Sequence, residues 1–301
     1  MALSSKFSTR GQVKSISLPC RSHPTTNRIE QELNESRAAA TVAASKPCAE
    51  TICSGLSQLT ELYKCMDDLL SSSSIKVLIS RQQNKNWVEE LIEESVVFLD
   101  VCGSIRDLVI EMKEHTRDIS CALRRRKGDV SVENSVMKYN CLRKKMRKDV
   151  KMLVGSLKQV DNMITNGGSV LVDSDNQLVA VIKAIIGVSE VTVSVFESLL
   201  LLFSMPISKQ NKWSIVVSKL IHKGMVACDD QQGILNEFEI IDDALQTLCK
   251  YESSNQGDKM HIAKCRLERL ETQLECMETR LECMFRRLVG TRASLLNIIS
   301  Q

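Results

Sequence analysis

The chain has 301 residues, with 40 Lys and Arg, 37 Asp and Glu and a formal net charge of +3. Only 4% of its residues are aromatic, and it contains 12 Gly and 4 Pro, a composition that favours helix over sheet. Residues 1–29 hold five basic residues and no acid, so the body carries 35 basic against 37 acidic residues. A nearly neutral body argues against a dedicated nucleic-acid binder, so no nucleic-acid partner is expected.

Residues 1–24 are predicted to form a disordered basic tail. Within it the segment SLPCRSHP is expected to be extended, because Pro19 and Pro24 fix φ and bias the preceding residues away from helix. Serines and basic residues without acids are also typical of an organelle transit peptide, so organelle targeting stays open beside a plain tail. Because no apolar signal segment begins the chain, we otherwise expect an intracellular, cytoplasmic protein with reduced cysteines.

Apolar residues recur every three or four positions through the rest of the chain, which predicts a series of helices. Asn27 followed by Glu30 resembles a capping box, so a first helix should begin near Arg28 and end before Pro47. Breaks are expected at 71–74, 128–129 and 167–168 and at Pro206. The other predicted helices span 49–70, 75–81, 86–126, 132–164, 175–205, 212–225 and 235–251, and a final long helix follows Gly257 and Asp258.

A leucine-rich stripe marks the final helix and sets the fold class. Its members alternate spacings of three and four: Leu267, Leu270, Leu274, Met277, Leu281, Met284 and Leu288. A coiled-coil-like edge of this kind has to be buried against other helices. Since no alternating strand pattern occurs, we predict an all-α fold, in which residues 25–301 form a single elongated bundle of long antiparallel helices.

The helix at 175–205 is apolar on nearly all sides and long enough to cross a bilayer. Its interior charges, Lys183, Glu190 and Glu197, are seven residues apart and share one line on the helix. Charges near the middle of a bilayer are costly, so this spacing favours an exposed line on a central helix of a soluble bundle. A membrane span is the alternative.

Two basic runs occur at 124–127 and 143–151. They are compatible with a nuclear address, a phosphate contact or an anionic membrane patch. Folding the chain about Gly128 and Asp129 instead predicts local compensation, because residues equally distant from the turn lie opposite one another. The expected pairs are Lys144 with Glu114, Arg147 with Glu111, and Lys151 with Asp107. The first run would sit at a helix C-terminus, where cations are favoured.

Candidate sites for chemistry are few. His261 and Cys265 share a helix face and make half of a metal site, but no second pair of ligands stands nearby. The 12 cysteines form no C-x-x-C pair, and no nucleophile elbow, P-loop or dinucleotide fingerprint is present. We therefore expect no catalytic, cofactor-binding or metal-binding residues, no cofactor and no enzymatic activity.

Several segments resemble a plant-specific all-helical family with a domain of unknown function, distantly related to the BYPASS developmental proteins. They are SLP at 17–19, RSHP at 21–24, ALRRRKGD at 122–129, KWS at 212–214, MFRRLV at 284–289 and SLLN at 294–297. The resemblance implies a role in root and shoot development and carries over no catalytic residues. We expect a non-enzymatic helical interaction protein with an unidentified protein partner. The alternative is a peripheral or single-span membrane protein that uses the helix at 175–205.

Overall fold

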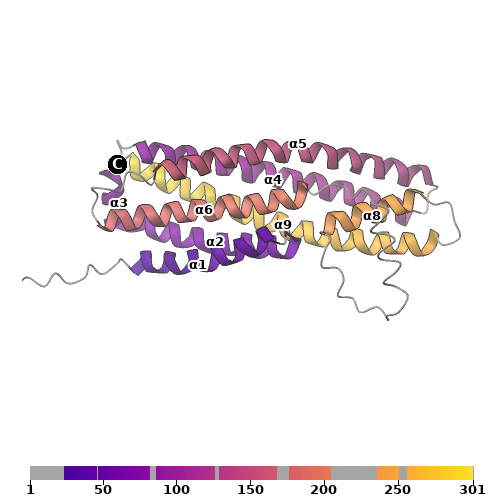
Figure 1. The fold of residues 1–301 in the computed structure, drawn as a ribbon, viewed down its shortest axis with the longest axis horizontal. Coiled ribbons are helices and arrows are strands. Elements are labelled where there is room, and N and C mark those ends of the chain that lie inside the picture. The colour runs from indigo at the N-terminus through magenta and orange to yellow at the C-terminus, as the bar shows by residue number, and fades with distance from the viewer. Residues whose placement is uncertain are drawn as a thin grey trace, which may run out of the picture.

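The computed structural model describes residues 24–45, 47–81, 86–125, 129–167, 176–204, 236–250 and 256–300. These residues form eight helices and no strand, and they assemble into one elongated bundle (Figure 1). The helices are α1 Pro24–Ser45, α2 Ala49–Ser71, α3 Ser73–Ser80, α4 Asn86–Arg124, α5 Asp129–Gly167, α6 Asn176–Ser204, α8 Glu237–Lys250 and α9 Gln256–Ile299. The predicted all-α bundle is confirmed. The tail before Pro24 and the helix predicted at 212–225 lie outside the described residues.

Helix boundaries follow most of the predicted breaks, with four differences. The α5 helix extends beyond the predicted 132–164 at both ends, because Asp129 and Gly167, which were predicted as breaks, are its first and last residues. The first helix begins at Pro24 rather than near Arg28, because proline is tolerated in the first turn, where its missing N–H costs nothing. Ser72 alone separates α2 from α3, so the predicted break at 71–74 interrupts the helical conformation at a single residue. The last helix begins at Gln256, and Gly257 falls inside its first turn.

Each long helix has a defined direction relative to its neighbours. Chain neighbours α1 and α2, α4 and α5, and α5 and α6 run antiparallel, as predicted (Figure 1). The α9 helix is antiparallel to α4 but parallel to α2, since its ion pairs with α4 descend in residue number while its contacts with α2 ascend. The bundle therefore combines antiparallel hairpins with one long-range parallel contact.

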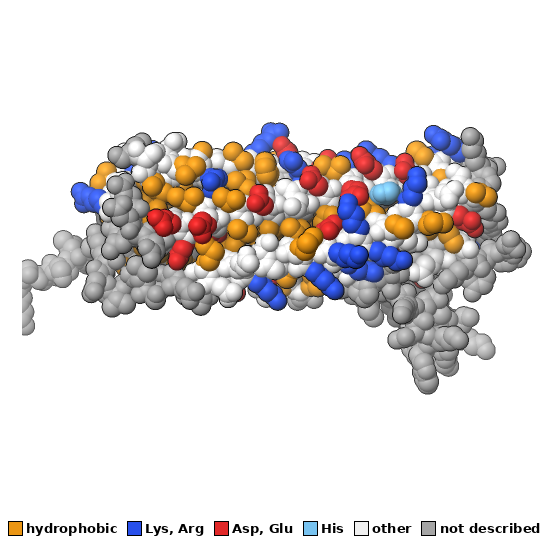
Figure 2. Space-filling model, turned by 90° about the horizontal axis from the view of Figure 1, so that it is seen from above, with side chains coloured by type: hydrophobic (Ala, Val, Ile, Leu, Met, Phe, Trp, Pro, Cys, Tyr) orange, Lys and Arg blue, Asp and Glu red, His pale blue; other side chains and the backbone are white. Residues whose placement is uncertain are grey.

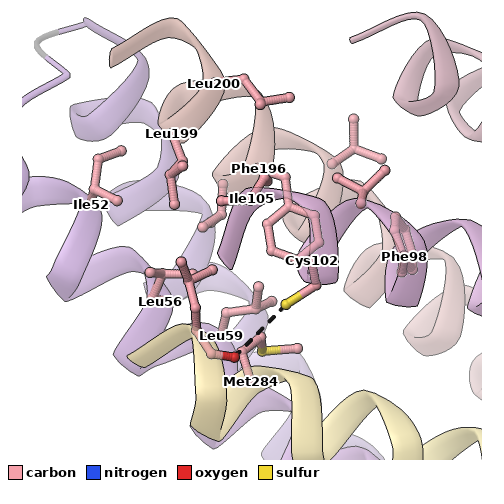
Figure 3. Packing of buried hydrophobic residues seen from close by; sticks show 14 of the residues in the cluster. Ile52, Leu56, Leu59, Phe98, Cys102, Ile105, Phe196, Leu199, Leu200 and Met284 are labelled. Atoms are coloured by element: carbon pink, nitrogen blue, oxygen red, sulfur yellow. Dashed lines mark hydrogen bonds between the residues drawn. The ribbon is translucent and has the colours of Figure 1, made fainter. Parts of the chain in front are cut away.

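The leucine stripe of α9 lies in the core. All seven predicted members are buried, with Leu274, Met277 and Leu281 fully inaccessible to solvent. Helices α2, α4 and α6 supply the side chains around this part of α9 (Figure 3). The stripe is therefore part of the monomer core rather than an exposed seam.

Aromatic and sulfur contacts complete this region of the core. The rings of Phe98 and Phe196 meet edge to face with centroids 6.3 Å apart, an arrangement that aromatic pairs favour. The Cys102 thiol lies 3.8 Å from the carbonyl oxygen of Leu281, which accepts its weak hydrogen bond (Figure 3). Burial raises the pKa of Cys102 to about 12, so this thiol behaves as a small apolar group.

The apolar helix α6 packs against α1, α2 and α5. Its segment Gln177–Ser204 is long and apolar enough to span a membrane, but 67% of its most apolar window is buried inside the bundle. Lys183 and Glu190 are exposed, as the line of charges predicted, whereas Glu197, the third member of the line, is half-buried. Glu190 accepts a 2.9 Å hydrogen bond from Arg37 of α1. A Cβ at Gly187 would lie 2.9 Å from a Leu33 methyl, so this glycine permits the close approach of α1.

Candidate functional site

A buried ion pair holds α5, α6 and α8 together near one end of the rod. Arg143 is fully buried, and its Nη2 donates to Asp242 Oδ2 at 3.2 Å. Its Nη1 donates to the carbonyl oxygen of Phe203 at 2.8 Å, and its guanidinium carbon lies 4.9 Å from the centroid of the Phe238 ring. Tyr139 donates to Asp242 Oδ1 at 2.9 Å.

Because this cluster is buried, an unpaired charge in it would be unfavourable. Burial, with the Asp242 carboxylate as the next contribution, raises the pKa of Tyr139 well above its usual value. The phenol therefore stays protonated and serves as a hydrogen-bond donor. The cluster positions α8, whose start is fixed by a capping box in which Asn236 Oδ1 accepts from the Glu239 backbone at 2.9 Å. The buried cluster of Arg143, Tyr139 and Asp242 therefore stabilises the packing of the helices and is not accessible to a substrate.

The predicted charge compensation between α4 and α5 is only partly correct. Glu111 pairs with Lys145 at 3.0 Å, not with Arg147, and Arg143 of the same basic run turns into the core. Lys144 and Lys151 are exposed and make no ion pair with the described part of the chain. Equal distance from the turn determines how far along the hairpin a residue lies. It does not determine where the side chain points, because successive side chains are rotated by about 100° around the helix axis.

The charged residues that flank the leucine stripe form a ladder with α4. Arg106 pairs with Glu282 at 2.8 Å, and Arg124, from the first basic run, pairs with Glu268 at 3.4 Å. Between these two rungs lie the pairs Lys113 with Glu278, Arg117 with Glu271 and Arg117 with Glu275. The charged side chains of this seam are therefore paired with one another across the two helices.

A polar groove of about 570 Å³ opens between α2 and α9. Four cations line it, Lys64 from α2 and Arg280, Arg286 and Arg287 from α9, whereas its one acidic lining residue is Glu61. Three of the cations have local partners, which are Glu61 for Lys64, Glu282 for Arg286 and Asp67 for Arg287. Arg280 is exposed and makes no ion pair with any described residue, so the groove carries a surplus of positive charge.

The model of one protein family, described as Protein BPS1, matches residues 55–298. The chain belongs to the BPS1 family. The match extends from α2 to the last turn of α9, so it includes both walls of the groove and the buried ion pair. It confirms the predicted relationship to the BYPASS proteins, a family with a regulatory role in development. Neither the curated proteins nor the solved structures contain a match to this chain.

The cysteines of this BPS1-family protein include one facing pair. The thiols of Cys53 in α2 and Cys276 in α9 are in hydrogen-bond contact, and burial followed by this contact raises the pKa of Cys53 to about 12. Such a thiol is a poor nucleophile at neutral pH. All ten cysteines in the described ranges are free thiols.

In this BPS1-family protein, His261 and Cys265 lie side by side, as their spacing of four residues predicted. His261 Nδ1 lies 3.8 Å from Cys265 Sγ on the exposed side of α9. Across the described helices, no three His, Cys, Asp or Glu side chains come together as metal ligands. Sequence reasoning named no catalytic or cofactor residue, and it missed Arg143, whose spacing of four from Tyr139 and three from Met146 marked it as facing inward.

Proposed function

We propose that this BPS1-family protein is a non-enzymatic interaction protein that regulates plant development by docking a protein partner. Family membership supports the developmental role. The rod is held by a continuous core and by a closed ion-pair ladder, which suits a rigid scaffold. A partner would therefore meet a preformed surface, at little cost in conformational entropy.

The groove between α2 and α9 is the observation that carries this proposal. Its volume of about 570 Å³ and its surplus of cations suit an acidic segment of another protein. The Arg280 guanidinium supplies donors that a carboxylate can engage in two parallel hydrogen bonds. Docking there would leave the α4–α9 ladder intact.

The test is affinity capture from plant tissue with the intact protein and two variants. Lys64→Glu combined with Arg280→Glu reverses the groove, whereas Arg269→Glu, an exposed position on α9 outside the groove, controls for a charge change on the same helix. We expect wild type and Arg269→Glu to retain the same partner, and the groove variant to lose it. The captured partner should then bind directly in purified form through an acidic segment. An identical set of captured proteins for all three would contradict the proposal.

A further inference from the structure

The outward face of α5 carries a row of lysines that the fold does not use. Lys144, Lys148, Lys151 and Lys158 are all exposed, and none makes an ion pair with the described residues. Lys148 lies two residues after the buried Met146, which places it about 200° around the helix from that core position. The row therefore faces away from the bundle. Figure 2 looks onto the α5 side of the rod, where blue side chains lie among red and exposed orange ones.

The lysine row is straight and almost free of acids. Spacings of four, three and seven keep its members within about 80° of one another over about 21 Å of helix. Between Met137 and Lys158 the one acidic residue of α5 is Asp149, which lies about 100° around the helix from Lys148. The row thus presents concentrated positive charge along a convex edge.

Large apolar side chains share this face with the lysines. Met137 and Met152 are 60% and 65% exposed, and each lies within about 40° of Lys148 on the helix. Flexible methionine side chains adapt to irregular apolar surroundings, including mobile ones. Lysines supply attraction to anionic lipids and exposed apolar side chains supply buried apolar area, and these two contributions set how strongly a helix binds a membrane surface.

We propose that the α5 outward face binds the surface of an anionic lipid bilayer and holds the rod parallel to it. A convex ridge suits a flat surface better than an extended peptide, which needs a groove. Lysine is a compact point charge that attracts anionic headgroups without demanding a fixed geometry, whereas the row has no arginine fork and no aromatic ring to read or stack a base. Since α5 lines neither wall of the α2–α9 groove, a partner docked there would remain accessible.

The experiment measures co-sedimentation of the purified full-length protein with vesicles. Vesicles of phosphatidylcholine alone are compared with vesicles containing about one third phosphatidylserine, at low and at physiological salt. We expect binding only to the anionic vesicles, with affinity falling as salt rises, because exposed charges are screened. Lys144→Glu, Lys148→Glu and Lys151→Glu together should weaken binding by at least about 100-fold, because each lysine near such a surface contributes about 1 kcal/mol, or about fivefold in affinity.

A matched control separates the row from net charge. Arg81→Glu, Arg125→Glu and Arg269→Glu change the net charge equally at exposed positions outside α5, and they should retain most of the binding. The triple Lys→Gln variant of the row, checked by circular dichroism, should also lose binding while staying folded. Equal binding by wild type and the row variants, equal binding to neutral vesicles, or tighter binding to duplex DNA than to vesicles would each overturn the proposal.

Discussion

Asp242 is the counter-charge of a guanidinium that has no access to water. Arg143 is fully buried, and it also donates to the Phe203 carbonyl and lies over the Phe238 ring, both of which are neutral groups. Removing one member of a buried pair leaves an uncompensated charge in a medium of low polarity. Asp242→Ala should therefore lower the free energy of unfolding by about 3–5 kcal/mol, measured by urea denaturation followed by circular dichroism.

The neighbouring residue provides the control for this substitution. Asp243 is half-exposed, and its carboxylate lies 3.9 Å from the guanidinium of Arg266, so Asp243→Ala should cost less than about 1 kcal/mol. Replacing the pair with Arg143→Met and Asp242→Leu should recover much of the loss, because no buried charge then remains. Equal costs for Asp242→Ala and Asp243→Ala would show that the ion pair contributes nothing specific.

Glu94 introduces a pH dependence of stability. It is buried between α4 and α6 beside Ser189, and burial raises its pKa to about 7, partly offset by the hydrogen bond with Ser189. A carboxyl with a pKa higher in the folded than in the unfolded state holds its proton more tightly when folded. Its contribution is fully favourable below the unfolded pKa of about 4.3 and is lost as pH rises through about 7.

Glu94→Gln should remove this dependence. We expect little change in the free energy of unfolding at pH 5. At pH 8, where the wild-type carboxylate is charged and buried, the substitution should raise the free energy of unfolding by up to about 3 kcal/mol, measured by urea denaturation. Glu93→Gln, at an exposed position of the same helix, should have almost no effect at either pH. The same gain for Glu94→Gln at both pH values would refute the role of the charge.

At the scale of the helices, the spacing of apolar residues was sufficient to predict the helices but not which of them pack against one another. The alternation of three and four predicted every described helix and the burial of the α9 stripe, because a single apolar edge determines which face turns inward. The parallel contact of α9 with α2 was not predicted, since it depends on tertiary packing between segments about 220 residues apart. The three consecutive cations at 143–145 lie in three different environments. Arg143 is in the core, Lys144 belongs to the outward row, and Lys145 pairs with Glu111.

The groove and the buried ion pair also depend on contacts between distant segments, which the local sequence pattern does not predict. Lys64 and Arg280 stand on different helices, and nothing in their local sequence places them together. Arg143 had a local signal in its spacing from Tyr139 and Met146, but its partner Asp242 is about 100 residues away. A charged residue at an inward position therefore indicates a buried partner without identifying it.

The register of the α4–α5 hairpin can be measured by double-mutant cycles. Lys145→Ala and Glu111→Ala should show a coupling of about 0.2–1 kcal/mol, the usual range for an exposed pair, because their side chains meet at 3.0 Å. The pair first expected from the turn, Lys144 and Glu114, should show none. Coupling for Lys144 with Glu114 and none for Lys145 with Glu111 would mean that the hairpin adopts the other register.

At the scale of the whole molecule, α9 connects both ends of the rod. It runs the length of the bundle and contacts α3 near one end and α8 near the other (Figure 1). Buried side chains form one continuous cluster from Ile75 of α3 to Leu245 of α8. The prediction that residues 25–301 form a single domain therefore implies that the two ends unfold together.

Substitutions at opposite ends of the rod test this cooperativity. Ile75→Ala and Leu245→Ala each remove a side chain that is 1% exposed or less, so each should cost about 2–5 kcal/mol through lost burial and a residual cavity. Hydrogen exchange should then show reduced protection at both ends in each variant, by the same free energy, because the slowest amides exchange by global unfolding. Val77→Ala, at a position of α3 that is 50% exposed, should change neither end. If Ile75→Ala loosens α3 and its neighbours but leaves α8 fully protected, the rod consists of separate folding units, and α9 bridges them without coupling them.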